Sequence, residues 1–205
     1  MKREYFGNQR GFTPLELMVA VLLTSMFAAS FYTAFRVMNA EMWRTRNYFE
    51  TNVSAKNVLD RISKDTEEAV NVVTSWAGNA TGTDSLVLKV PSIDGAGEPT
   101  NISTQFDYIT YRINPTDSTQ LLRSVDVLAG TSQREGGADI TDAVVGRRIE
   151  SVVFSYVGTS LGLVAAATIP QMKYINAQIT TQRTTLGATQ QTQVDTDITL
   201  KNRIS

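Results

Sequence analysis

The chain of 205 residues contains neither cysteine nor histidine. No disulfide can form, and the lack of both residue types excludes thiolate sites, zinc sites built on Cys or His, and Ser-His or Cys-His catalysis. The net charge of −1 gives no overall attraction for nucleic acid or for an anionic membrane surface. We therefore expect no cofactor and no metal, and we do not expect nucleic acid as a partner.

Glycine and proline are also missing from residues 15–77. Because these residues interrupt helices, their absence predicts one long helix over residues 13–74. Pro14 falls in the first turn, where its missing N–H costs nothing. At 1.5 Å per residue such a helix would be roughly 90 Å long.

The first part of this helix, residues 12–36, contains an apolar run with a single charge, Glu16. A helix over 12–35 reaches roughly 36 Å and can cross a bilayer core of about 30 Å. A plain single-pass anchor or an uncleaved signal peptide has the same appearance. Glu16 argues against both, because an unpaired carboxylate inside a bilayer costs about 3 kcal/mol or more. The run holds no basic residue to neutralise it.

The residues around Glu16 form a motif, Arg-Gly-Phe-Thr-Pro-Leu-Glu at 10–16. A basic leader, a glycine, an aromatic residue and this glutamate together resemble the processing site of type IV prepilins and type II secretion pseudopilins. The resemblance implies that a prepilin peptidase removes the leader, residues 1–11, by cutting between Gly11 and Phe12. It also implies that Phe12 becomes N-methylated, and that Glu16 pairs with the amino terminus of a neighbouring subunit during assembly.

Residues 37–78 are predicted to form the amphipathic half of the helix. Apolar residues recur at steps near three, four or seven, which is the helical period. This stripe, which we expect to pack against a globular head, consists of Met38, Met42, Phe49, Val53, Leu59, Ile62, Ala69 and Val73.

Residues 79–205 change character and are predicted to form a β-rich head. Short alternating apolar segments bounded by turn residues indicate strands. These predicted strands cover 85–90, 108–113, 120–127, 150–157, 174–181 and 195–201, and the pair 108–113 and 120–127 is typical of a hairpin. The fold class is therefore α+β: a pilin-like lollipop with one long N-terminal α-helix packed on a mainly antiparallel β-sheet head.

The order of these pieces resembles the minor pilins of the PilW kind and the J-type minor pseudopilins of type II secretion. The resemblance implies a minor structural subunit that helps to initiate or cap a pilus or pseudopilus. Its partners would be other minor and major pilin subunits, the prepilin peptidase and an inner-membrane assembly platform. It would cross the inner membrane once, with the head in the periplasm, before entering the filament.

Other functions stay open at the level of sequence. The head could instead be a binding module at the filament tip, which recognises a surface, a secreted protein or DNA through predicted loops at 91–106 and 129–146.

Two acid pairs could in principle contribute to a calcium site, namely Asp139 with Asp142 and Asp195 with Asp197. Neither pair matches the spacing of a calcium-binding loop, so both are interpreted as solvated loop charges. Arg147 and Arg148 are interpreted as surface residues, and no enzymatic activity is expected.

Overall fold

The computed structural model describes residues 11–100, 104–158, 172–185 and 188–200. Within them the chain forms one long helix, α1 (Pro14–Glu68), followed by ten strands and a short 3-10 helix. The sheets are antiparallel throughout. This confirms the predicted α+β class with one long N-terminal helix and a mainly antiparallel sheet.

The helix α1 runs without interruption for 55 residues, or about 83 Å. Its predicted end near residue 74 is wrong, and only the part of segment 37–78 up to Glu68 is helical. Beyond it, the backbone N–H of Val70 donates to the carbonyl of Lys89 at 2.9 Å, and that of Val73 to Val87 at 3.1 Å. These hydrogen bonds to a strand replace the helical ones, so the β-branched residues at 70–73 pair with a sheet instead of continuing the helix.

The face that α1 buries includes Leu59 and Ile62 of the predicted stripe, and Ala69 just beyond the helix is buried as well, but the N-terminal part of the stripe is wrong. Phe49 and Val53 are 62% and 54% exposed, and Met38 and Met42 are exposed as well. The buried positions repeat at steps of three and four, as a helix face must. They are Asn47, Thr51, Ala55, Val58, Leu59, Ile62, Asp65 and Thr66. Four of these are polar, so hydrophobicity alone selected the wrong face between residues 47 and 55.

The larger sheet has five strands in the order β1-β4-β5-β6-β7. Its members are β1 (Asn71–Val72), β4 (Ser85–Pro91), β5 (Phe106–Ile113), β6 (Gln120–Asp126) and β7 (Ile140–Arg147). The predicted hairpin is confirmed, since β5 and β6 pair from Tyr108↔Asp126 to Ile113↔Leu121. A separate two-stranded ribbon consists of β2 (Ser75–Trp76) and β3 (Asn79–Ala80).

The second sheet has three strands in the order β10-β9-β8. Its members are β8 (Ile149–Gly158), β9 (Met172–Thr185) and β10 (Ala188–Thr199). The strand predicted over 195–201 therefore begins seven residues too late, and Lys201 lies outside the described residues. Inward-facing residues such as Ile175, Ala177 and Ile179 alternate with partly exposed ones along β9, as expected for a sheet with one buried face.

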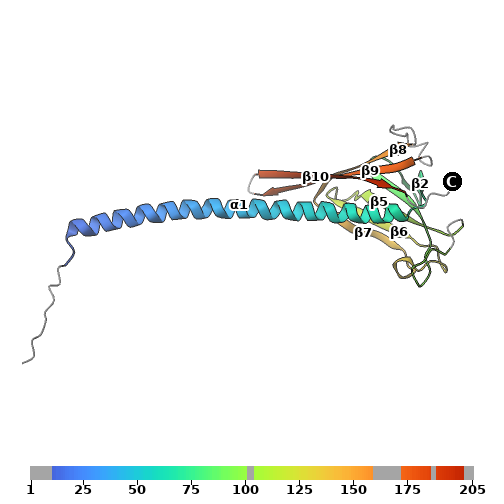
Figure 1. The fold of residues 1–205 in the computed structure, drawn as a ribbon, viewed down its shortest axis with the longest axis horizontal. Helices are drawn as coiled ribbons and strands as arrows, with labels where there is room; N and C mark the ends of the chain where they lie inside the picture. Colours follow the sequence, from blue (N-terminus) through green and yellow to red (C-terminus); the bar gives the residue numbers. More distant parts are fainter. Residues whose placement is uncertain (1–10, 101–103, 159–171, 186–187, 201–205) are drawn as a thin grey trace, which may run out of the picture. The chain divides into compact units, whose positions relative to one another are not determined.

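The chain divides into two compact units, residues 1–46 and 47–205. In the second unit the C-terminal part of α1 has β9 and β10 on one side and β6 and β7 on the other (Figure 1). One hydrophobic cluster joins the helix with both sheets, through Ile62 of α1, Tyr111 of β5 and Phe154 of β8 among others. The core therefore forms by packing the two sheets around the last turns of the helix.

Candidate functional site

The start of α1 contains a reciprocal pair of capping contacts. Thr13 is the N-cap, Pro14 follows as the first helical residue, and Glu16 is the third. The backbone N–H and the hydroxyl of Thr13 donate to Oε2 of Glu16 at 2.9 and 3.0 Å, and the N–H of Glu16 lies 3.3 Å from the Thr13 hydroxyl. This is a capping box, in which two backbone donors without helical partners are satisfied by side chains.

The capping box gives Glu16 a local structural role that the sequence interpretation missed. The signal was present, because Thr13-Pro14-Leu15-Glu16 is the spacing of a capping box with proline at its favoured first position. Both hydrogen bonds that Glu16 accepts use Oε2. Among the described residues no hydrogen bond uses Oε1, so the carboxylate can cap the helix and still accept from another donor.

Gly11 and Phe12 lie immediately before this cap, in a segment that is neither helix nor strand. Both are exposed, and the Phe12 side chain is 86% exposed. A Cβ added to Gly11 would meet nothing within 4 Å. The peptide bond between them therefore lies between two exposed residues outside the helix. The rest of the predicted leader, residues 1–10, lies outside the described residues.

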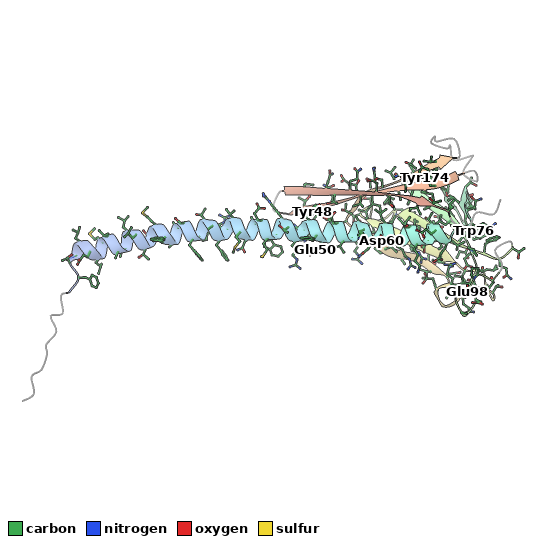
Figure 2. The ribbon with its side chains drawn as sticks, viewed as in Figure 1. Tyr48, Glu50, Asp60, Trp76, Glu98 and Tyr174 are labelled. Atoms are coloured by element: carbon green, nitrogen blue, oxygen red, sulfur yellow. The ribbon has the colours of Figure 1, made fainter. Side chains whose placement is uncertain are left out.

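The helix after the cap presents apolar side chains on every side. No described residue before Asn47 is buried, and Phe27 and Phe31 are each 75% exposed. Figure 2 shows side chains projecting from this part of α1 on both sides of the ribbon. The helix is long and apolar enough to cross a membrane. A surface of this kind is stable in lipid or against other apolar helices, and not in water.

Three hydroxyl groups within the apolar stretch are satisfied inside the helix. The hydroxyls of Thr24, Ser25 and Thr33 donate to backbone carbonyls three or four residues earlier, at 2.7 to 2.8 Å. In a bilayer no water is available to these groups, so internal hydrogen bonds remove their desolvation cost. The capping box likewise gives hydrogen-bond partners to the backbone N–H groups of Thr13 and Glu16 at the start of the helix.

The second unit contains a buried ionic cluster where α1 meets the larger sheet. Asp65 accepts from the Tyr111 hydroxyl at 2.6 Å and from Nε of Arg123 at 2.7 Å. Glu135 accepts from both Arg123 and Arg61 at 2.9 Å. The side chains of Asp65 and Arg123 are each 4% exposed. Burial, together with the Asp65 charge, raises the pKa of Tyr111 well above its usual value, so the phenol stays a donor.

A second cluster ties the end of the helix to the loops. Arg134 donates to Glu68 at 2.8 Å, to Asp107 at 3.1 Å and to the carbonyl of Pro91 at 2.9 Å. Asp107 is fully buried and also accepts from Ser132 at 2.7 Å. Arg134 begins the 3-10 helix η1 (Arg134–Gly136). The predicted loop at 129–146 is therefore wrong, since it holds η1, a buried arginine and most of β7.

A cavity of about 520 Å³ lies beside these two clusters, lined by charged residues including Arg61, Lys64, Arg123 and Glu135. Its arginines already donate to carboxylates, as described above. The arginines of the cavity wall therefore belong to ion pairs that anchor the helix to the sheet.

The acids and arginines that the sequence singled out contact different partners in the structure or are exposed. Asp139 accepts the backbone N–H of Val127 at 2.8 Å. Asp142 binds Arg112 at 2.8 Å. Asp197 accepts from Asn176 at 2.8 Å, and Arg148 pairs with Glu50 at 3.2 Å. Asp195 is exposed on β10, and Arg147 is exposed at the end of β7. The described part of the chain brings no three Asp, Glu, His or Cys residues together in a metal-binding group.

No protein-family model matches the chain, and no curated protein matches it significantly.

Proposed function

We propose that the chain is the precursor of a type IV pilin-like subunit, which is processed between Gly11 and Phe12 and then enters a filament. One observation carries this proposal. An exposed, non-helical Gly-Phe bond directly precedes a capped helix whose apolar surface is exposed on all sides. An ordinary anchor requires neither the exposed bond at this place nor a carboxylate in the first turn.

The proposed mechanism begins with cleavage after Gly11 and N-methylation of Phe12 by a prepilin peptidase. Cleavage creates a positive amino terminus at the end of the apolar helix. Oε1 of Glu16, which the capping box leaves available, would accept from the amino terminus of a neighbouring subunit. Since an isolated charge is costly in the bilayer, this pairing favours the assembled state over the single subunit.

The rest of the molecule fits a minor subunit in this scheme. The apolar half of α1 bundles with the helices of other subunits, and the head determines which subunits are neighbours. The helix is uninterrupted from Pro14 to Glu68, whereas the bulk pilins that it resembles commonly have a proline or glycine midway along the apolar segment. We therefore infer a role in initiating or capping the filament. The precursor would be an inner-membrane protein with its head in the periplasm.

Intact-mass and N-terminal peptide mass spectrometry test this proposal. The chain is produced in membranes with and without a prepilin peptidase. We expect a mature chain that starts at N-methylated Phe12 only when the peptidase is present. A chain that starts at Met1 in both samples, or one cut near Ser30, would contradict the proposal.

The variant Gly11→Val sharpens this test. Since a Cβ at position 11 meets nothing within 4 Å, the substitution leaves the fold of the described residues intact. We expect it to reduce the processed fraction at least tenfold while the amount of chain in the membrane stays unchanged. Normal processing of this variant would mean that the peptidase does not recognise Gly11.

A further inference from the structure

The strand β10 forms a long open edge of the three-stranded sheet. It is 12 residues long and pairs with β9 in an unbroken register from Ala188↔Thr185 to Thr199↔Tyr174. Among the described residues β9 is its only partner strand. Residues 188–199 contain no glycine, proline, lysine or arginine. Proteins commonly use such residues, or a β-bulge, to prevent an edge strand from pairing with another chain.

The edge of the larger sheet is built differently. The pairing of β7 with β6 has two register shifts, and Asp142 in β7 has a positive φ of 53°. These irregularities bend the backbone so that a further strand cannot continue the ladder. The β7 edge of the larger sheet is therefore irregular, whereas the β10 edge of the smaller sheet is regular over its full length. A regular edge of this kind can accept a further strand.

A groove runs between β10 and the adjacent flank of α1. Its volume is about 380 Å³. It is lined by Asn52, Lys56, Leu59, Asp60 and Ser63 of the helix and by Val194, Asp195 and Thr196 of β10. Figure 2 labels Asp60 on this part of the helix. Val194 belongs to the inward-facing side, because it pairs with the buried Ile179 and packs against the core, whereas Asp195 is exposed.

The charges on β10 determine which strand can be added. Asp195 and Asp197 both lie on the exposed face, and the strand has no basic residue. A second copy of β10 in antiparallel pairing would bring four carboxylates to one face, and like charges on opposing strands are destabilising. A strand with lysine or arginine at alternate positions would instead oppose these acids with the favourable sign.

We propose that β10 is a docking edge for an extended segment of a different protein. The incoming strand continues the sheet by backbone hydrogen bonds to β10. Its outward side carries basic residues that face Asp195 and Asp197, and its inward side places an apolar residue in the groove against Leu59 and Val194. This is recognition by strand addition, in which the main chain supplies affinity and alternate side chains supply specificity. The inference goes beyond the proposed function and does not depend on cleavage after Gly11.

The test uses the unprocessed full chain in neutral detergent and a fluorescent heptapeptide of alternating lysine and valine, capped at both ends. Two matched peptides serve as controls, one with glutamate in place of lysine and one with the same side chains but N-methyl groups on alternate amides. Fluorescence anisotropy measures binding, and hydrogen exchange detected by mass spectrometry locates it. We expect the lysine peptide to bind at least tenfold more tightly than either control and to slow exchange within residues 188–200.

Variants of the chain complete the test. Asp195→Lys should weaken binding of the lysine peptide at least fivefold, whereas Asp84→Lys, the same charge change at an exposed position outside the groove, should leave it unchanged. Equal binding of the N-methylated peptide would overturn the proposal, because it would show charge attraction without a ladder. Dimers of the full chain with protected β10 amides in the absence of peptide would also overturn it, in favour of a second copy.

Discussion

At the scale of single residues, one costly feature of the structure is the buried pair of Asp65 and Arg123. Taking two charges out of water is unfavourable, and their attraction compensates only when geometry and hydrogen bonding are good. Here Asp65 also accepts from Tyr111, and Arg123 also donates to Glu135, so both charged groups have a second partner. Burial opposes the charge of Arg123, but its hydrogen bond to Asp65 and the Asp65 charge outweigh this effect and raise its pKa. Arg123 therefore stays charged, and its hydrogen bond to Asp65 fixes the position of the helix on the sheet.

Replacing this arginine should be strongly destabilising. Arg123→Met removes the buried cation that donates to Asp65 and leaves, among the described residues, only Arg61, 3.7 Å away and partly exposed, as an ion-pair partner. We therefore expect a loss of about 3–5 kcal/mol in the free energy of unfolding. The measurement is a urea titration of the full chain in neutral detergent, followed by near-UV circular dichroism. As a control, Arg148→Met removes a more exposed partner of Glu50 and should cost less than about 1 kcal/mol. Equal effects of the two variants would show that the buried pair is not a specific anchor.

At the scale of elements, α1 begins and ends for different kinds of reasons. Its start is local, since Thr13, Pro14 and Glu16 form a cap within one turn. Its end depends on tertiary contacts, since the chain leaves the helix to pair with β4.

Between its two ends, the helix approaches the larger sheet closely at Gly146 of β7. A Cβ there would lie 2.9 Å from Cγ2 of Val58 and 3.2 Å from Cδ1 of Ile149. Glycine at this position allows helix and sheet to meet.

A methyl group at this contact should therefore destabilise the second unit. Gly146→Ala forces Val58 or Ile149 to move, and we expect it to reduce the free energy of unfolding by about 1–3 kcal/mol. The same urea titration measures the change. Gly95→Ala is the matched control, because a Cβ at position 95 meets nothing within 4 Å, and its effect should stay within about 0.5 kcal/mol. An effect of Gly146→Ala no larger than the control would mean that the backbone adjusts freely at this point.

At the scale of the whole molecule, the two units are suited to different surroundings. The described residues up to Phe35 expose apolar side chains on all sides of the helix, whereas the unit from Asn47 on buries a core of aliphatic and aromatic residues. The first unit is stable in lipid or among other helices, and the second is stable in water. Glu16 stands in the first turn of the apolar helix, where the helix N-terminus favours a carboxylate but lipid would not solvate it. If Glu16 only caps the helix, the chain is a plain membrane anchor. If Glu16 also pairs with a neighbouring chain, it is an assembling subunit.

Two variants separate these roles of Glu16. Glu16→Gln keeps the capping hydrogen bonds, because glutamine also serves at the third position of a capping box, but it removes the charge. Thr13→Ala removes the cap at a cost of about 1 kcal/mol and keeps the charge. If Glu16 pairs with a neighbouring amino terminus, Glu16→Gln should be cleaved normally yet enter filaments at least tenfold less than the native chain. Thr13→Ala should enter them at a near-native level.

Quantitative immunoblotting of sheared filaments and membranes from the native host gives both values. Processing is followed in the same samples by the mass of the N-terminal peptide. The opposite result, with Glu16→Gln incorporated normally and Thr13→Ala excluded, would show that Glu16 acts as a cap. It would then leave the proposed pairing without support.

The sequence predicted correctly those elements whose pattern lies within one short segment of the chain, and it missed those that depend on distant partners. The hairpin of β5 and β6 is encoded by alternating apolar residues on both sides of a polar turn, and it was predicted correctly. The strand β7 was missed because its residues, Ile-Thr-Asp-Ala-Val-Val-Gly-Arg, contain an acid and a glycine that resemble a loop. The start of β10 was missed because its first residues are threonine and glutamine, which gain their strand conformation from pairing with β9.

The sequence by itself determined the long helix, its apolar half and the α+β class, because each depends on residues within a few turns or one hairpin of each other. The candidate site at Gly11, Phe12 and Glu16 is of this kind, and it could be located without coordinates. Only the tertiary structure decided where the helix ends, which of its faces is buried, and which strand edge is left open. Each of these depends on partners far apart in the chain, such as Val70 with Lys89 or Asp65 with Arg123. The residue pattern of one segment cannot show which distant residue it will contact, because the contact free energy is gained only when the sheets pack around the helix.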